Sequence, residues 1–420
     1  MIRIGVFMKR AVVCALSLLM LVLAGACGSG SSNSSSSTNN PVTPGANVVP
    51  ITVNAGPAGT STNGLFVSVT VCVPGTSNCQ TIDNILVDTG SQGLRLLNSV
   101  LTVPLPNETI GGNDVAECVQ YVDGSFNWGS VRMADVHIGG EQANSIPVQI
   151  AGDLAASTVP SNCSVNATTG ESGTEVDTVQ SLLANGVLGL GPFREDCGTI
   201  CPSSLSSLPS GVYVPYYTCS ANGPCQPAAV TLGQQLQNPV WKFSGDNNGV
   251  IIQLPAISDT GAPSASGSLV FGIGTQSNNE LGSASVVQLD DTGSFTTTFN
   301  NQSYDQSFID SGSNGLYFPN VTNIATCSSN ADFYCPASTL TLSATNSGTN
   351  GGSNNVTFKV ANAQVLFSSN NGSNTALSDL AGTNPPPSFD WGLPFFFGRT
   401  VFTAIDGQST PAGTGPYFAY

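Results

Sequence analysis

Two aspartates stand in nearly identical surroundings at widely separated points of the chain. Asp88 lies in ILVDTGSQGLRLL (85–97) and Asp310 lies in QSFIDSGSNGLYFP (306–319). In both segments apolar residues precede Asp–Thr/Ser–Gly–Ser, and a second Gly and further apolar residues follow. One Asp-Thr-Gly is a common coincidence, but a match over ten aligned positions is not. The repeat predicts two related lobes that each contribute one aspartate at their boundary.

Two carboxyl groups held within hydrogen-bonding distance form a unit that can activate water. They cannot both ionise at low cost, so they share one proton and titrate together. The ionised member can take a proton from a water molecule while the protonated member donates to a substrate carbonyl oxygen. Asp88 and Asp310 are therefore candidates for general acid–base hydrolysis without a covalent intermediate. The alternative is two ordinary turns in which each Asp caps backbone N–H groups.

The residues around each aspartate suit this chemistry. Glycine allows the tight turn that presents a carboxylate, and Gly90 and Gly312 stand at the same place in the two copies. Thr89 and Ser311 can each hydrogen-bond to the opposite turn. We expect two further hydroxyl groups to hold the outer carboxylate oxygens, those of Ser91 and Ser313.

Short apolar runs broken by Gly, Pro, Asn or Ser fill most of the chain after Val48, as in GLFVSVTVCVPG and GSLVFGIG. Such punctuation is typical of strands. Helical patterns are few and short, near Thr178 and near Val230. The segment 193–227 carries four cysteines and little periodicity, and we interpret it as a disulfide-braced surface insertion. The sequence therefore predicts an all-β protein with a few short helices.

Basic residues are scarce, which excludes some functions. The net charge is −16, only 8% of residues are charged, and no basic run exists, so we expect no nucleic-acid partner. The single histidine, His137, has the pattern of a solvated or partly packed strand residue. No GxSxG motif accompanies it, so a Ser-His-Asp triad is not indicated. Several other acids fit turns or the surface better than catalysis: Asp83, Asp123, Asp290, Asp291 and Asp305.

Cysteine usage points to an oxidising compartment. Ten of the twelve cysteines follow the first 27 residues, and an even number in an exported chain indicates disulfides. Three near-neighbour pairs could each close a hairpin or loop: Cys72/Cys79, Cys219/Cys225 and Cys327/Cys335. A zinc site is the rival interpretation. It is disfavoured because no CxxC spacing occurs and one histidine is present, so we expect no metal and no cofactor.

The N-terminal residues 1–27 have the pattern of an export signal, with a basic start, an apolar core and the ending LAGAC. This ending resembles a bacterial lipobox, although Ala24 stands where Leu is usual. Cys27 would then be acylated and would anchor the protein in the bacterial cell envelope, at the outer membrane or cell surface. Plain secretion or a periplasmic location is the alternative. The Ser/Asn-rich segment 28–50 reads as a flexible linker.

Together these motifs resemble the pepsin-like aspartic peptidases, from about Ile51 to Tyr420. The segment 120–140 looks like the flap hairpin of that family, with Tyr121 at the place of the flap tyrosine. NGVLGLG (185–191) resembles the strand behind the first aspartate turn, and PFFFGRTVFTAID supplies Phe396, Phe397 and Gly398 as the matching apolar–apolar–Gly element. The resemblance implies a bilobal fold. We expect an N-terminal lobe over 51–275 and a C-terminal lobe over 276–420.

The flap region departs from the family pattern. Arg95 stands where the family usually has Trp, and Val122 stands where Gly usually follows the flap tyrosine. Trp128 is a candidate partner for Tyr121 in place of that Trp. Arg95 either lines the cleft and binds an acidic group, or lies at the surface or in an ion pair. The whole chain also resembles a bacterial group of uncharacterised lipoproteins, which implies no substrate.

The function that these residues favour is an aspartic endopeptidase acting on peptides or unfolded proteins. Asp88 and Asp310 would activate water, and Tyr121 would close over an extended peptide. We expect a monomer that contacts the membrane only through its lipid anchor. One alternative is a non-catalytic envelope protein that binds peptide or glycan on the same fold. Another is a cell-surface scaffold in which the cleft is incidental.

Overall fold

A computed structural model describes residues 45–165, 170–201, 214–220, 224–384 and 387–420. The predicted signal, Cys27 and most of the predicted linker lie outside the described residues. The first strand, β1 (Val48–Asn54), begins inside the range 28–50 that was expected to be linker. No described helix is long and apolar enough to cross a membrane.

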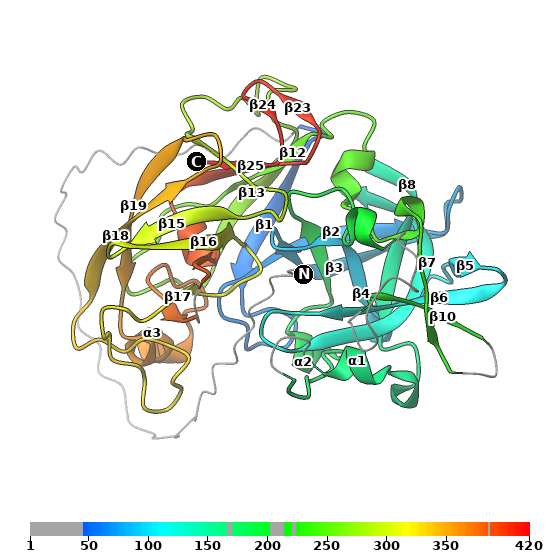
Figure 1. The fold of residues 1–420 in the computed structure, drawn as a ribbon, viewed down its shortest axis with the longest axis horizontal. Coiled ribbons are helices and arrows are strands. Elements are labelled where there is room, and N and C mark those ends of the chain that lie inside the picture. Colours follow the sequence, from blue (N-terminus) through cyan, green and yellow to red (C-terminus); the bar gives the residue numbers. More distant parts are fainter. Residues whose placement is uncertain (1–44, 166–169, 202–213, 221–223, 385–386) are drawn as a thin grey trace, which may run out of the picture.

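A central antiparallel sheet joins the two halves of the molecule and runs across the top of Figure 1. It combines the first strand of the chain with strands from its middle and its end. Its strands follow the order β1, β13 (Ala265–Phe271), β12 (Gly249–Gln253), β22 (Thr400–Ala404), β25 (Tyr417–Ala419) and β14 (Val286–Gln288). Alternate residues of these strands, such as Ile51, Leu269 and Ile252, are buried in the main core.

The N-terminal lobe continues the same hydrogen-bonded sheet and lies on the right of Figure 1. Its main strands are β2 (Gly64–Cys72), β3 (Cys79–Asp88), β4 (Gln92–Leu97), β6 (Asn113–Gln120), β7 (Phe126–Ile138), β8 (Glu141–Ala151), β9 (Gly186–Leu190) and β10 (Tyr216–Cys219). Two very short strands extend its edge, β5 (Thr109–Ile110) and β11 (Gln226–Pro227). The hairpin β6–β7 lies where the sequence predicts a flap, and its tip is at residues 121–125.

The C-terminal lobe is a separate seven-stranded sheet. Its order is β19 (Ser353–Val360), β18 (Leu340–Ser347), β15 (Phe295–Phe299), β16 (Gln302–Ile309), β21 (Asp390–Trp391), β17 (Leu316–Phe318) and β20 (Ala381–Thr383). Aromatic rings fill its interior, where Phe389 stacks on Phe318 at 5.0 Å and on Trp391 at 4.4 Å between ring centroids. The remaining hairpin, β23 (Ser409–Thr410) with β24 (Gly413–Thr414), stands apart from both sheets.

The two lobes repeat one arrangement around the aspartates. In the N-terminal lobe, β3 leads into Asp88 and pairs in parallel with β9, while β4 after the turn pairs antiparallel with β9. In the C-terminal lobe, β16 leads into Asp310 and pairs in parallel with β21, while β17 pairs antiparallel with β21. The predicted fold class, an all-β bilobal pepsin-like fold, is confirmed by this repeat.

The register corrects one prediction about this repeat. Asp88 pairs with Gly189, and Ile309 pairs with Trp391, so the glycine opposite Asp310 is Gly392 rather than Gly398. The apolar run with Phe396 follows that point as a buried 3-10 turn, Leu393–Phe396. FFFG fits the apolar pattern expected for this strand, whereas the strand that forms carries a carboxyl group, Asp390, in the first of its two apolar places.

Helices are short, as expected. They are α1 (Ser161–Ser164), α2 (Val179–Leu182) and α3 (Ala363–Ser368). Of the two predicted helical segments, the one near Thr178 forms α2, where the Thr178 side chain caps the first turn. The other, near Val230, was wrong: it forms only the 3-10 turn Leu232–Gln234.

Five disulfides brace the described chain. The three near-neighbour pairs form as predicted, Cys72–Cys79, Cys219–Cys225 and Cys327–Cys335. Two more pairs join Cys118 to Cys163 and Cys197 to Cys201. All ten cysteines after residue 27 are therefore paired, which suits an exported protein. The insertion 193–227 is braced by two of these bonds, but Tyr216 in its strand β10 is buried rather than superficial.

Candidate active site

The two aspartate turns meet at the lobe boundary with matching hydrogen bonds. The Gly90 amide donates to Asp88 Oδ1 at 2.8 Å, and the Ser91 hydroxyl donates to Asp88 Oδ2. The Gly312 amide donates to Asp310 Oδ1 at 2.7 Å, and the Ser313 hydroxyl donates to Asp310 Oδ2 at 2.9 Å. Both aspartates are 0% exposed, and a hydrogen bond joins their carboxyl groups. The structure thus assembles a carboxyl dyad.

Four hydrogen bonds lock the turns to each other across the boundary. The Thr89 amide donates to Ser311 Oγ at 3.1 Å, and the Ser311 amide donates to Thr89 Oγ1 at 2.9 Å. Each hydroxyl then donates onward to the opposite strand, Thr89 to the Ile309 carbonyl at 3.2 Å and Ser311 to the Val87 carbonyl at 2.8 Å. Because every partner is backbone or hydroxyl, the distance between the two aspartates is fixed by the fold.

Gly312 is required by space. A Cβ atom at this position would lie 2.7 Å from Asp88 Oδ1 and 3.1 Å from Asp310 Oδ1. Any side chain would therefore push against the dyad itself. The glycine lets one lobe's turn approach the other lobe's carboxyl group directly.

Burial raises the pKa of both carboxyl groups, but not equally. For Asp88 the effect of burial is opposed by hydrogen bonds from Asp310, Ser91 and Gly90 and by the positive charge of Arg95. For Asp310 burial is reinforced by the charges of Asp88 and Asp390, so its pKa lies well above the ordinary range. The larger upward shift favours Asp310 as the member that keeps the shared proton, while the two carboxyl groups titrate as one unit.

Asp390 is a site residue that the sequence reasoning missed. It is 0% exposed on β21, where it pairs with Phe308 and Tyr317, and its charge acts on Asp310. In the other lobe the equivalent position on β9 is Val187. The signal was present as an acid between Phe389 and Trp391, but only the strand register shows that it belongs beside the dyad.

Tyr121 stands at the start of the flap tip and points into the protein. It is 2% exposed, packs in a cluster with Leu86, Val119 and Val187, and donates a hydrogen bond to Asn127 Oδ1. The predicted partner was wrong: the Trp128 indole donates to Thr158 Oγ1 at 3.0 Å instead. Val122, the next flap residue, is 38% exposed.

The flap is held on several sides. Its strand β6 lies between β7 and β10, so neither edge of that strand is open. A disulfide ties Cys118 to Cys163, and the Gln120 side chain donates to the carbonyls of Cys163 and Val165 at 2.8 and 2.7 Å. The Phe126 amide donates to the Thr174 carbonyl at 3.0 Å. A wide swing of the hairpin would break all of these contacts.

Arg95 does not line the cleft. It is 1% exposed, and its guanidinium lies 2.7 Å from Glu117 Oε1 and 3.3 Å from Asp196 Oδ2. The Tyr216 hydroxyl donates to both oxygens of Asp196, at 2.8 and 2.9 Å. The predicted substrate contact is therefore replaced by a buried ion network. It links the strand after the first aspartate turn to the flap and to the insertion 193–227.

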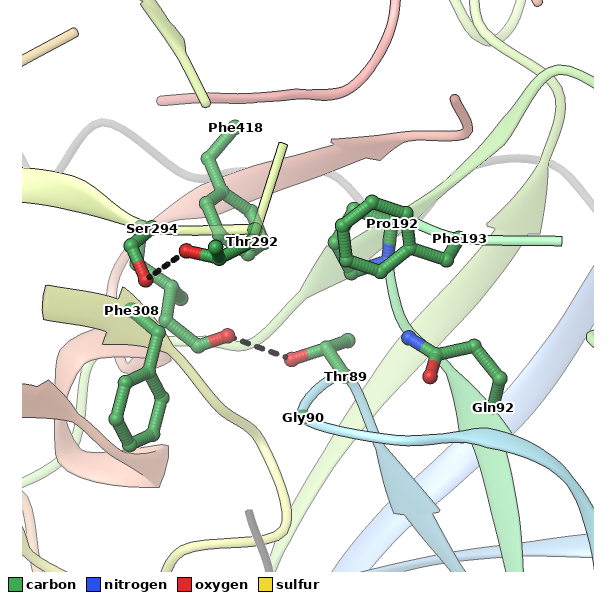
Figure 2. A pocket seen from close by; sticks show the side chains of 11 residues that line it. Thr89, Gly90, Gln92, Pro192, Phe193, Thr292, Ser294, Phe308 and Phe418 are labelled. Carbon is green, nitrogen blue, oxygen red and sulfur yellow. Dashed lines mark hydrogen bonds between the residues drawn. The ribbon is translucent and has the colours of Figure 1, made fainter. Parts of the chain in front are cut away.

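A small cavity adjoins the dyad on one side. Figure 2 shows Thr89 and Gly90 at its base and Phe193 opposite Thr292 and Ser294. Its wall is mostly apolar, with contributions from both lobes: Gln92, Pro192, Phe308, Ile309, Gly293 and Phe418. The cavity is a place where part of a ligand next to the dyad could lie.

The remaining candidate residues lie away from the dyad. His137 is partly packed on β7, in agreement with its sequence pattern. Within the described ranges, no group of three or more His, Cys, Asp or Glu side chains is placed to hold a metal ion.

Comparison with known proteins gives a family and a likeness to solved structures. No curated protein matches the chain. Among solved structures, the aspartic proteinase from Irpex lacteus is similar with a TM-score of 0.48 and 15% identity, over 89% of this chain and 96% of that one. A family model described as "Protein of unknown function (DUF3443)" matches residues 43–420. The chain therefore belongs to the DUF3443 family.

Proposed function

We propose that the protein is an exported aspartic endopeptidase that hydrolyses peptide bonds with water activated by Asp88 and Asp310. The observation that supports this most is the hydrogen-bonded pair of buried carboxyl groups, each held by a glycine amide and a serine hydroxyl. Ordinary capping turns would not bring two acids from different lobes into contact, because that contact is unfavourable unless they share a proton.

The unequal pKa shifts suggest which carboxyl group does what. Asp88, ionised first, takes a proton from a water molecule as the water oxygen attacks the substrate carbonyl carbon. Asp310, protonated, donates its proton to the carbonyl oxygen, which gives a neutral tetrahedral gem-diol. The gem-diol then collapses: the C–N bond breaks, the nitrogen takes the proton held by Asp88, and Asp310 recovers a proton from a hydroxyl group. The dyad ends in its starting state.

The other candidate residues take supporting roles in this proposal. Thr89 and Ser311 fix the separation of the carboxyl groups, and Ser91 and Ser313 orient them. Tyr121 braces the tip of the flap from within through its bond to Asn127 on β7. A peptide would lie as an added strand beneath the flap.

A second candidate function is peptide or glycan binding without hydrolysis. The restrained flap favours it, because strand pairing on both edges of β6 and the Cys118–Cys163 bond limit closure over a substrate. The same dyad would then serve only as a polar floor of the binding site.

The deciding experiment is proteolysis of an unfolded protein mixture across pH, with and without pepstatin. A working dyad should give a bell-shaped profile in the acid range, since the fully protonated and fully ionised pairs are both inactive. Asp88→Asn and Asp310→Asn should each lower the rate by several orders of magnitude, because the two acids act as a unit. Asp305→Asn is the matched control, since that acid is exposed on β16 next to the same turn. Peptide binding with no cleavage at any pH would support the second function.

We also propose that the mature chain is a monomer anchored through an acylated Cys27. The five disulfides fit export, and the residues before Val48 leave room for a tether. Radiolabelled palmitate should enter the wild-type protein and not Cys27→Ser in the native host. Incorporation into both would refute the anchor.

A further inference from the structure

The loop between β1 and β2, residues 55–63, reaches from the N-terminal lobe to the C-terminal lobe. Its last residue, Asn63, is 1% exposed and uses its whole amide in hydrogen bonds there. Asn63 Nδ2 donates to the carbonyls of Asn314 and Leu377 at 2.8 and 2.9 Å, and Asn63 Oδ1 accepts from the Leu377 amide at 2.7 Å. The backbone N–H of Asn63 donates to the Thr375 carbonyl at 2.7 Å. One residue thus makes four bonds across the lobe boundary.

One of these bonds, the one to the Asn314 carbonyl, ends beside the dyad. Asn314 directly follows Ser313, whose hydroxyl holds Asp310. A peptide that crosses the dyad as an added strand pairs with backbone groups on both sides of it. On the Asn314 side the backbone carbonyl is already bonded to Asn63. We call this side the closed arm of the cleft.

Two other features lie along the closed arm. The loop 55–63 approaches α2 and the cluster that contains Tyr121, since a Cβ on Gly56 would lie 2.8 Å from the Leu183 carbonyl and 2.9 Å from the Phe66 ring. Tyr317 lies on this side too, because its hydroxyl donates to Asn314 Oδ1. The loop 55–63 and the C-terminal lobe therefore meet there.

A second set of residues beside the aspartate turns is different in kind. The cavity of Figure 2 lies beside Gly90 and Gln92 and is bordered by the ring of Phe193 against Gly293, and neither Asn63 nor Asn314 lines it. A ring that packs by apolar contact can rotate aside without leaving a buried polar group unbonded. We call this side the open arm.

We propose that Asn63 is a latch that determines substrate specificity. In the resting protein, a peptide can extend from the dyad along the open arm. A peptide can cross the dyad onto the closed arm only after the Asn63 hydrogen bonds break. This inference rests on the proposed peptide-binding cleft. It predicts that the preferred peptide substrate has its reacting bond close to one of its own ends. Bonds in the interior of a longer peptide react only after the Asn63 hydrogen bonds break.

The backbone at Asn63 gives a clean way to remove the latch. Its φ is +52°, in the left-handed region that glycine adopts without strain, so Asn63→Gly deletes the side chain and keeps the turn. Asn63→Asp is the second variant: it keeps the size and Oδ1 but replaces two N–H donors with an oxygen facing two carbonyls. Asn301→Gly is the control, since Asn301 has φ +60° in the exposed turn between β15 and β16.

The assay is fluorescence anisotropy of labelled statine peptides, whose tetrahedral hydroxyl imitates the hydrated carbonyl at the dyad. One probe extends from statine toward its N-terminus, one toward its C-terminus, and one in both directions. Wild type should bind one single-sided probe best. Asn63→Gly and Asn63→Asp should tighten the two-sided probe and the other single-sided probe by about 10- to 100-fold, the equivalent of displacing three ordinary hydrogen bonds. The favoured probe and Asn301→Gly should stay unchanged.

Equal binding of all probes by wild type, with no gain in the Asn63 variants, would overturn the latch whether or not the protein cleaves peptides. Binding that follows the prediction without hydrolysis in the proteolysis assay would refute only the peptidase. Failure of every probe to bind wild type and both Asn63 variants would overturn the latch together with the peptide-binding cleft.

Discussion

Replacing Arg95 with methionine should destabilise the protein by about 3–5 kcal/mol at neutral pH, the usual loss when one partner of a buried ion pair is removed. The guanidinium lies 2.7 Å from Glu117 Oε1 and 3.3 Å from Asp196 Oδ2, with all three side chains at most 2% exposed. Methionine fills similar space but leaves both carboxyl groups buried without their cation. Because the side chains are buried, water screens the two carboxyl groups poorly.

The loss should shrink as the solution becomes acidic. Burial, followed by the neighbouring charge of Glu117, raises the pKa of Asp196 well above its ordinary value. The folded state therefore binds this proton more tightly than the unfolded state. The contribution of Asp196 to stability is present below its unfolded pKa and is lost as the pH rises through its folded pKa. Arg95 lowers the pKa of Asp196, so removing Arg95 should raise that pKa further. The pH range over which this contribution is lost should then become wider.

Urea unfolding of wild type and Arg95→Met at about pH 7 and about pH 4 measures both effects. Lys359→Met is the control, because the Lys359–Asp259 pair is exposed and should matter little. A loss in Arg95→Met below about 1 kcal/mol at neutral pH would show that the network contributes no more than a surface pair. An equal loss at both pH values would refute the role given to Asp196.

Two further changes test the dyad and its support. Ser311→Ala removes the bond to the Val87 carbonyl and the acceptor for the Thr89 amide, so it should lower the free energy of unfolding by about 2–4 kcal/mol, measured in urea; Ser303→Ala, at an exposed site on β16, is its control. Asp310→Asn should abolish hydrolysis yet raise the melting temperature at neutral pH and leave it nearly unchanged in acid, because burial and the charge of Asp88 make an ionised Asp310 unfavourable. A lower melting temperature for Asp310→Asn at neutral pH would contradict the raised pKa.

The features that could be predicted are those encoded by neighbouring residues. Asp88 bonds to Gly90 and Ser91 within its own turn, so a short motif specifies that geometry. The same is true of Asp310, and the internal repeat then implies that the two turns meet. Disulfides between near neighbours were accessible for the same reason, since a short loop brings both cysteines together.

The features that could not be predicted depend on partners far along the chain. Arg95 meets Glu117 and Asp196, 22 and 101 residues away, and no local pattern distinguishes that environment from a cleft. Asn63 bonds to Asn314 and to Leu377, which lie 251 and 314 positions further along the chain. The place of β21 could not be predicted because hydrophobicity alone favours FFFG over DWG, whereas hydrogen bonding to β16 decides the pairing.

The strand order of the central sheet also determines how much of the chain must be present before folding can be completed. Val48 at the start of β1 pairs with Val270, and Gly249 in β12 pairs with Ala404 in β22, so the central sheet is completed only by residues far apart in the chain. Contacts this distant form late in folding. A nascent chain that ends before Asp310 contains only one of the two aspartates and an incomplete central sheet. The complete dyad therefore forms only once the final strands of the central sheet are available.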